Sequence, residues 1–125
     1  MENIINKELL EALAKFQGEN KAITKDCQNK FLKNKYATLD AIIEDVKPIM
    51  SKHGLSFVQL LSVEGVETLI FHSEGGVLSS GIMKIEPQVN NGISYAQAVG
   101  IATTYTKRYQ LGSMLGISTE EDTEH

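Results

Sequence analysis

The stretch Leu55–Ile85, LSFVQLLSVEGVETLIFHSEGGVLSSGIMKI, decides the fold. Glycine-containing turns divide it into three apolar runs rich in β-branched and aromatic residues, Leu55–Val63, Glu67–Ser73 and Val77–Ile85. Short runs of this composition, joined by tight turns, are typical of antiparallel strands. Gly81 within the third run indicates a bulge or a close backbone approach. We therefore expect a three-stranded antiparallel β-meander.

A long helix is predicted directly after the meander, over Ser94–Leu115. The sequence Ser94-Tyr95-Ala96-Gln97 has the S-x-x-Q spacing of a capping box, in which the serine and glutamine side chains satisfy free backbone amides. Gly100 lies in the interior of this helix, where glycine costs up to about 1 kcal/mol relative to alanine. We expect this glycine to permit close packing across the sheet.

Two more helices are predicted before the meander. Apolar residues recur at helical spacing over Ile4–Gln17, and Thr38 is placed to cap a second amphipathic helix. Pro48 lies inside the second pattern and predicts a kink or a break, because proline lacks the amide of an interior helical residue. Glu19–Lys35 is polar and non-periodic, which favours a long loop. The fold class is therefore α+β, a three-stranded meander packed by a long C-terminal helix and preceded by N-terminal helices.

Length and composition bound the class of protein. A chain of 125 residues is enough for one domain, which we assign to residues 1–119, followed by an acidic tail at 120–125. No apolar run reaches the roughly 18 residues needed to cross a bilayer, and no secretory signal is apparent at the N-terminus. The single cysteine, Cys27, fits a reducing compartment. We expect a cytoplasmic protein that does not associate with membranes.

The charge of this chain is segregated along the sequence. The net charge is -4, but four of the sixteen acidic residues lie at positions 120–125, which leaves twelve acids and twelve bases in residues 1–119. Within 21–35 five lysines, Lys21, Lys25, Lys30, Lys33 and Lys35, accompany a single acid, Asp26. Such a cluster attracts phosphate groups locally, although a solvated lysine loop has the same composition.

Cations lie beside aromatic rings in two places, which suits a ligand that offers both phosphates and stackable bases. The first is the segment around Tyr36, and the second is Thr103–Tyr109 in the last predicted helix. Two alternatives remain open, that Tyr105 lines the core and that Arg108 forms an ordinary ion pair. The predicted nucleic-acid-binding residues are Lys30, Lys33, Lys35, Tyr36, Thr104, Lys107, Arg108 and Tyr109.

No catalytic constellation is apparent in the sequence. His53 and His72 lie on different predicted elements without an adjacent nucleophile, and the phosphate-binding pattern G-x-x-x-x-G-K-[ST] is missing. The acidic run Glu120–Asp122 has ligands suited to magnesium, but terminal acidic runs are more typical of solvated tails. We therefore predict a binding protein that is not an enzyme, with no metal and no cofactor.

Three segments of the chain resemble the ERF superfamily of phage recombination proteins. One begins at Asn29-Lys30-Phe31 and Lys35-Tyr36-Ala37, and a second is the hairpin around His72-Ser73-Glu74-Gly75. The third and most specific is the helical pattern Q-x-x-G-x-x-x-T-Y-x-x-R-Y-x-L, which runs here from Gln97 to Leu111. The turn order after His72 and the mixed acidic run at 120–122 both depart from the family pattern.

The resemblance implies an ATP-independent protein that coats single-stranded DNA and pairs it with a complementary strand. It also implies a β-β-β-α core shared with the ring-forming annealing protein of eukaryotic recombination, and assembly as a ring or helical filament. A phage exonuclease or a single-strand-binding protein would be a further partner, inside a bacterial host cell. The alternative is a module that docks a replication or recombination protein without binding DNA itself.

Overall fold

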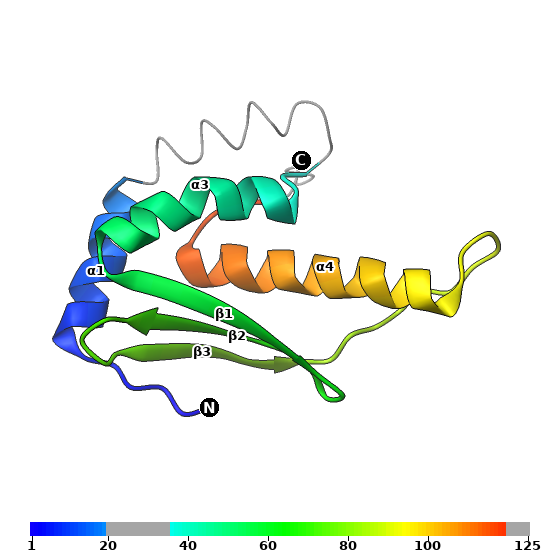
Figure 1. Cartoon of the computed structure of the whole chain (residues 1–125), viewed down its shortest axis with the longest axis horizontal. Coiled ribbons are helices and arrows are strands. Elements are labelled where there is room, and N and C mark those ends of the chain that lie inside the picture. The colour runs from blue at the N-terminus through cyan, green and yellow to red at the C-terminus, as the bar shows by residue number, and fades with distance from the viewer. Residues whose placement is uncertain (20–35, 120–125) are drawn as a thin grey trace, which may run out of the picture.

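The computed structural model describes residues 1–19 and 36–119, which form three helices and one sheet (Figure 1). Except for Glu19, the predicted loop, with Lys30, Lys33 and Lys35, lies outside the described residues, and so does the predicted acidic tail. The α+β class and the meander followed by a long helix are confirmed. The elements in chain order are α1 (Lys7–Gly18), α3 (Leu39–Lys52), β1 (Leu55–Ser62), β2 (Gly65–His72), β3 (Val77–Met83) and α4 (Tyr95–Leu115).

The sheet has the order β1-β2-β3, and both strand pairs are antiparallel. Glycine is required at the β1–β2 turn, because Gly65 has φ 137° and a Cβ there would lie 2.1 Å from the carbonyl oxygen of Met83. The predicted irregularity at Gly81 is confirmed. Its φ is 74°, and the β2–β3 register shifts between Glu67 and Leu69.

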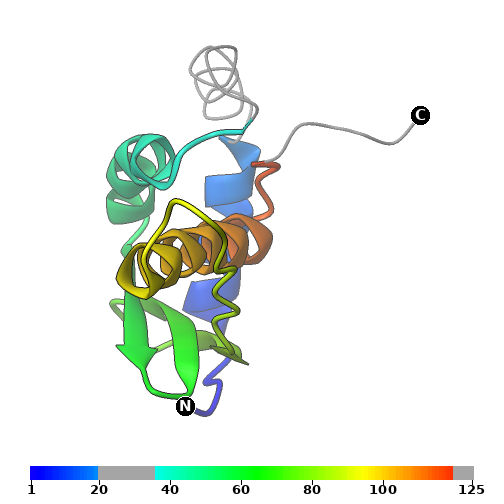
Figure 2. The same ribbon diagram turned by 90° about the vertical axis from the view of Figure 1, so that its right-hand side faces the viewer.

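Helices α3 and α4 lie over one face of the sheet, and α1 crosses one end of it (Figure 1). Viewed nearly along α4, the sheet lies on one side of this helix and α3 on another (Figure 2). Their apolar sides meet in a common core, and burial of this surface is the main stabilising term of the fold. The largest core side chains are Leu9, Phe16, Ile42, Val46, Met50, Ile70, Leu111 and Leu115.

Two details of the N-terminal helices differ from the sequence prediction. The first helix begins at Lys7 rather than Ile4, because the Asn6 side chain caps it by accepting a 2.9 Å hydrogen bond from the amide of Leu9. Ile4 instead forms an antiparallel bridge with Val77 at the outer edge of β3. Of the kink or break predicted at Pro48, the break is wrong. Helix α3 continues to Lys52, because Pro48 lies on its exposed face while the buried residues on both sides of it pack on the core.

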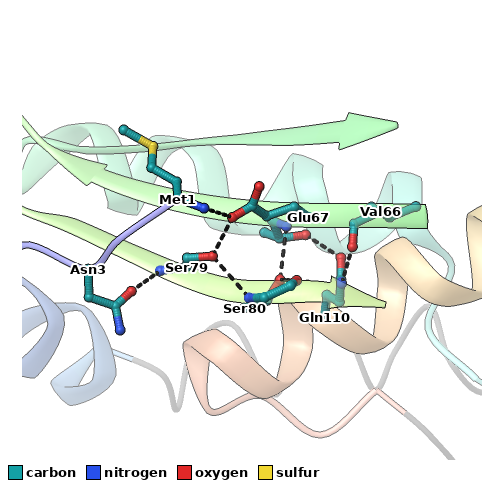
Figure 3. Close-up of polar contacts among 9 residues, drawn as sticks. Met1, Asn3, Val66, Glu67, Ser79, Ser80 and Gln110 are labelled. Carbon is teal, nitrogen blue, oxygen red and sulfur yellow. Dashed lines mark hydrogen bonds and ion pairs between the residues drawn. The ribbon is translucent and has the colours of Figure 1, made fainter. Parts of the chain in front are cut away.

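A buried polar network holds α4 against the sheet. The hydroxyl of Thr68 in β2 donates a 2.7 Å hydrogen bond to Oε1 of Gln110 in α4, and Nε2 of Gln110 donates to the carbonyl oxygen of Val66 at 2.7 Å. Gln59 in β1 donates to both the Thr68 hydroxyl and the carbonyl oxygen of Lys107, each at 3.0 Å. Figure 3 shows Gln110 reaching the backbone of β2. Because these bonds require particular partners, they fix the rotation of α4 about its axis and therefore which of its faces is solvent-exposed.

The opposite face of β2 is contacted by the N-terminal segment. The α-amino group of Met1 lies 2.8 Å from Oε2 of Glu67, and the Asn3 side chain accepts a 2.7 Å hydrogen bond from the amide of Ser79 (Figure 3). The Ser79 hydroxyl also donates to Glu67, at 2.7 Å. Hydrogen bonds from the α-amino group and from Ser79 lower the pKa of the Glu67 carboxyl.

Candidate nucleic-acid interface

Two rows of side chains run along the outer face of α4. Residues four apart share a helix face, so the rotation of α4 that points Gln110 at the sheet places both rows away from it. One row contains Gln97, Ile101, Tyr105 and Tyr109, and the other contains Gly100, Thr104 and Arg108. The first row is exposed throughout, and in the second Gly100 and Thr104 are exposed while Arg108 is buried.

A groove with a volume of about 810 Å³ follows these rows. The capping box at Ser94 begins the helix beside this groove, with the Ser94 and Gln97 side chains each bonding the other's backbone amide at 3.1 and 2.8 Å. The wall opposite α4 includes Tyr36, which precedes α3. The lining residues are Tyr36, Ile93, Gln97, Gly100, Ile101, Thr104, Tyr105 and Arg108.

Gly100 does not pack against the sheet, so the sequence prediction for this residue is wrong. It is exposed and lines the groove. A Cβ at Gly100 would meet no other described atom within 4 Å, apart from its chain neighbours and the backbone of its own helix. The missing side chain therefore leaves space in the groove rather than space for a packed element.

Three tyrosine rings surround Arg108 at one end of the groove. Its guanidinium carbon lies 4.1 Å from the ring centre of Tyr36, 5.3 Å from that of Tyr105 and 5.8 Å from that of Tyr109. Arg108 is only 5% exposed, whereas Tyr36, Tyr105 and Tyr109 are 40%, 47% and 38% exposed. A desolvated cation–π contact contributes about 2 kcal/mol, so the cluster offsets part of the cost of burying this charge.

The sequence left open whether Tyr105 lines the core, and the structure answers that it does not. Tyr105 and Tyr109 form a tilted pair, with ring centres 4.5 Å apart and planes inclined by 44°. This geometry is within the range of favourable aromatic pairs, and it leaves part of each ring open to solvent. Rings presented in this way can stack against a flat ligand.

The remaining predicted residues are only partly brought together. Thr104 is exposed in the groove, between Gly100 and Arg108. Lys107 is half-buried and is not among the residues that line the groove. Lys30, Lys33 and Lys35 lie outside the described residues, and Tyr36, which follows Lys35 in the sequence, lines the groove.

Two residues that flank positions 20–35 in the sequence, Glu19 and Ala37, are held to the rest of the domain by side-chain and backbone contacts. Before it, the Glu19 carboxylate lies 2.6 Å from Nε2 of His53, and this hydrogen bond is the main cause of the lowered pKa of Glu19. After it, the amide of Ala37 donates a 3.1 Å hydrogen bond to the carbonyl oxygen of Thr119. Thr119, the last of the described residues, therefore lies beside Ala37.

A second, smaller groove of about 360 Å³ lies on the other side of the Ile101–Tyr105 row. It separates α4 from the chain that follows β3, and most of its lining is apolar. The residues that line it include Met83, Lys84, Glu86, Ala98, Ile101 and Tyr105. Tyr105 therefore contributes to both grooves.

Neither a metal-ligand cluster nor a membrane-spanning helix is present within residues 1–19 and 36–119. This part of the chain contains no group of three or more His, Cys, Asp or Glu residues that could hold a metal ion. Its helices are also too short or too polar to cross a membrane.

Sequence reasoning missed five residues of the main groove, Ile93, Gln97, Gly100, Ile101 and Tyr105. Residues four apart share a helix face, so counting in steps of four from Gln97 and from Gly100 would have identified most of them. The usual apolar signal did not, because the buried side of α4 carries polar residues such as Thr103, Thr106 and Gln110.

Comparison with known proteins agrees with the pattern of residues on α4. The model of the ERF superfamily matches residues 9–125. The essential recombination function protein of Salmonella phage P22 is 28% identical over 126 residues, an alignment that covers 96% of this chain and 60% of that protein. This chain thus spans about three-fifths of the length of that relative, and no solved structure matches it. Since the family model covers nearly the whole chain, including the groove, the protein belongs to the ERF superfamily.

Proposed function

We propose that this protein binds single-stranded DNA along α4 and anneals it to a complementary strand, without ATP, in phage or prophage recombination. The observation that carries the proposal is the groove beside α4, which is lined by Tyr36, Tyr105 and the buried Arg108, with the ring of Tyr109 also beside this arginine. Aromatic rings that accept bases, next to cations that accept phosphates, are the general means of binding single strands without sequence preference. Membership of a family whose phage P22 relative is named for recombination agrees with this role.

In this proposal, the aromatic side chains contact the bases and the cationic side chains contact the phosphates. Tyr36, Tyr105 and Tyr109 support unpaired bases, and Thr104 lies on the strand's path along the groove. Lys107, together with Lys30, Lys33 and Lys35 from the preceding segment, lowers the repulsion between phosphate chains. The base edges stay available to a second strand, so annealing requires no bond to be made or broken in the DNA backbone.

We also propose that the protein acts as a homo-oligomer in the bacterial cytoplasm. In the described part of the chain, β1 is an edge strand of the sheet. It exposes the apolar side chains of Val58, Leu60 and Leu61, as well as Val63 in the following turn. Edge strands with exposed apolar residues favour pairing with another chain, and a second copy would extend the groove into a longer path.

The direct test is fluorescence anisotropy of a labelled single-stranded oligonucleotide, titrated with the protein at low and moderate salt. Binding should weaken steeply with salt, because each neutralised phosphate contributes a slope of about 0.7 in log affinity against log salt. Annealing of two dye-labelled complementary strands should be faster with the protein than without it, in the absence of ATP. Failure to bind at low salt would contradict the proposal.

Matched variants separate the α4 site from a general effect of charge. Lys107→Ala should lower the affinity for single-stranded DNA. It should also reduce the slope of log affinity against log salt by the contribution of about one phosphate contact. Lys47→Ala also removes one lysine, from an exposed position on α3 rather than from the turn of α4 that carries Arg108, and should leave both quantities unchanged. Equal losses in the two variants would place the binding surface elsewhere.

The second candidate function is docking of a recombination protein, such as an exonuclease or a single-strand-binding protein, without contact to DNA. The apolar lining of the smaller groove favours it. The affinity for a protein partner that docks in this groove would be nearly independent of salt, whereas the affinity for DNA would fall as salt is added.

A further inference from the structure

The burial of Arg108 is hard to reconcile with a role as a phosphate ligand. A side chain that contacts phosphates must present its N–H groups to the solvent-facing strand, and Arg108 is almost entirely covered. Lys107, the next residue, is more accessible and belongs to the same turn of α4. The same helical turn therefore supplies one cation that can reach a phosphate and one that is enclosed by rings.

The guanidinium of Arg108 connects two elements that are distant in sequence. Tyr105 and Tyr109 come from α4, whereas Tyr36 precedes α3, and all three ring centres lie within 6 Å of the guanidinium carbon. A planar, delocalised cation can lie over several rings at once, which the compact ammonium group of lysine does less well. Arg108 thus limits how far Tyr36 can move relative to the Tyr105–Tyr109 pair.

We infer that Arg108 is a positioning residue, and that the three tyrosines it holds form one platform for unpaired nucleobases. Tyr105 is the central residue of this platform, because it is the most exposed of the three rings and contributes to both grooves. The inference rests on the proposed DNA binding and assigns the bases, rather than the phosphates, to this end of the groove.

The test compares two ligands of equal length, a thymidine oligonucleotide and an abasic oligonucleotide that has the same phosphates without bases. The protein contains no tryptophan and only four tyrosines, so intrinsic tyrosine fluorescence reports mainly on the platform. The thymidine oligonucleotide should quench this fluorescence and bind roughly tenfold more tightly than the abasic one, in keeping with stacking of at least one base.

Arg108→Lys keeps the charge but removes the planar group. It should lower the affinity for the thymidine oligonucleotide by about five- to tenfold and reduce the quenching, while the affinity for the abasic oligonucleotide and the salt slope stay unchanged. Lys107→Ala should instead weaken the binding of both ligands by a similar factor. Equal losses of both ligands in Arg108→Lys, together with a smaller salt slope, would show a phosphate contact and overturn the inference.

Because Arg108 is buried, replacing it can unfold the protein, so a second pair of variants tests the platform at an exposed residue. Tyr105 is about half exposed, so Tyr105→Leu and Tyr105→Phe should both keep the circular dichroism spectrum of the parent protein. Only Tyr105→Leu should lose the preference for the thymidine oligonucleotide. If the parent protein binds both oligonucleotides equally, DNA binding stands and the platform is refuted, and if it binds neither, the proposed function fails as well.

Discussion

Replacing Gly100 should stabilise the protein and, depending on the new side chain, block the groove. Gly100 is an interior residue of α4, and its φ is not positive. Its backbone conformation therefore suits any L-residue. A Cβ there would meet no described atom within 4 Å outside its own helix and chain neighbours. Gly100→Ala should therefore recover the full helix-propensity difference of about 1 kcal/mol. For a domain of this size, that gain raises the melting temperature by roughly 4 °C.

Gly100→Leu should stabilise α4 almost as much, because leucine is also a strong helix former, but its side chain would enter the groove. We expect at least a tenfold loss of affinity for single-stranded DNA in this variant, since the strand would have to leave the groove floor. Ala96→Leu is the matched control, because it adds leucine to an exposed position of the same helix that lines neither groove. Thermal melting followed by circular dichroism and anisotropy titrations would measure both effects.

The combination of outcomes tests the reasoning. A leucine at position 100 that stabilises the fold and abolishes binding places DNA on α4 without the ambiguity of a destabilised variant. Unchanged binding in Gly100→Leu would refute the groove as the path of the strand. A fall in the melting temperature of Gly100→Ala would show instead that the space beside Gly100 is occupied, for example by a second copy of the chain.

Three further outcomes follow from the contacts that support the site. Thr68→Val should lower the free energy of unfolding by about 1–3 kcal/mol in urea titrations, because it leaves the buried Gln110 oxygen without its donor, and Thr68→Ser should recover most of the loss. Gly65→Ala should cost at least about 2 kcal/mol by the same assay, since both its φ and the adjacent carbonyl exclude a Cβ, and near-native stability would contradict the turn geometry. Because the hydrogen bond to His53 lowers the pKa of Glu19, the ionised carboxylate stabilises the fold above the ordinary pKa of 4.5, and this contribution is lost as the pH falls from there through the lowered pKa. Over that acid range Glu19→Gln should lose less stability than the parent, and parallel losses would mean that the bond to His53 contributes nothing.

The strands and the start of α4 could be predicted because their signals are local. Glycine turns separate the three apolar runs, and the capping box at Ser94 requires only a residue three positions away. The start of α1 depended on a distant contact. Ile4 has the apolar character of a helix residue, yet it pairs with Val77 on β3, a partner that no helical window of the sequence includes.

The candidate site was harder to predict, because it depends on the rotation of α4. A helix normally reveals its inner face by an apolar stripe, but α4 buries Thr106 and Gln110 through hydrogen bonds. The partner of Thr106 is a carbonyl within α4, whereas those of Gln110 are the Thr68 hydroxyl and the Val66 carbonyl in β2. The partners in β2 are visible only once the sheet is assembled. The sequence therefore identified Arg108 as a cation near rings without revealing that the rings enclose it.

The contacts on either side of residues 20–35 have an evolutionary consequence. Glu19 is held by His53, and Ala37 is held by Thr119, so the fold contacts the chain at both ends of this stretch whatever its length. Because both contacts are made by residues outside positions 20–35, lysines can be added or removed within that stretch without loss of either one.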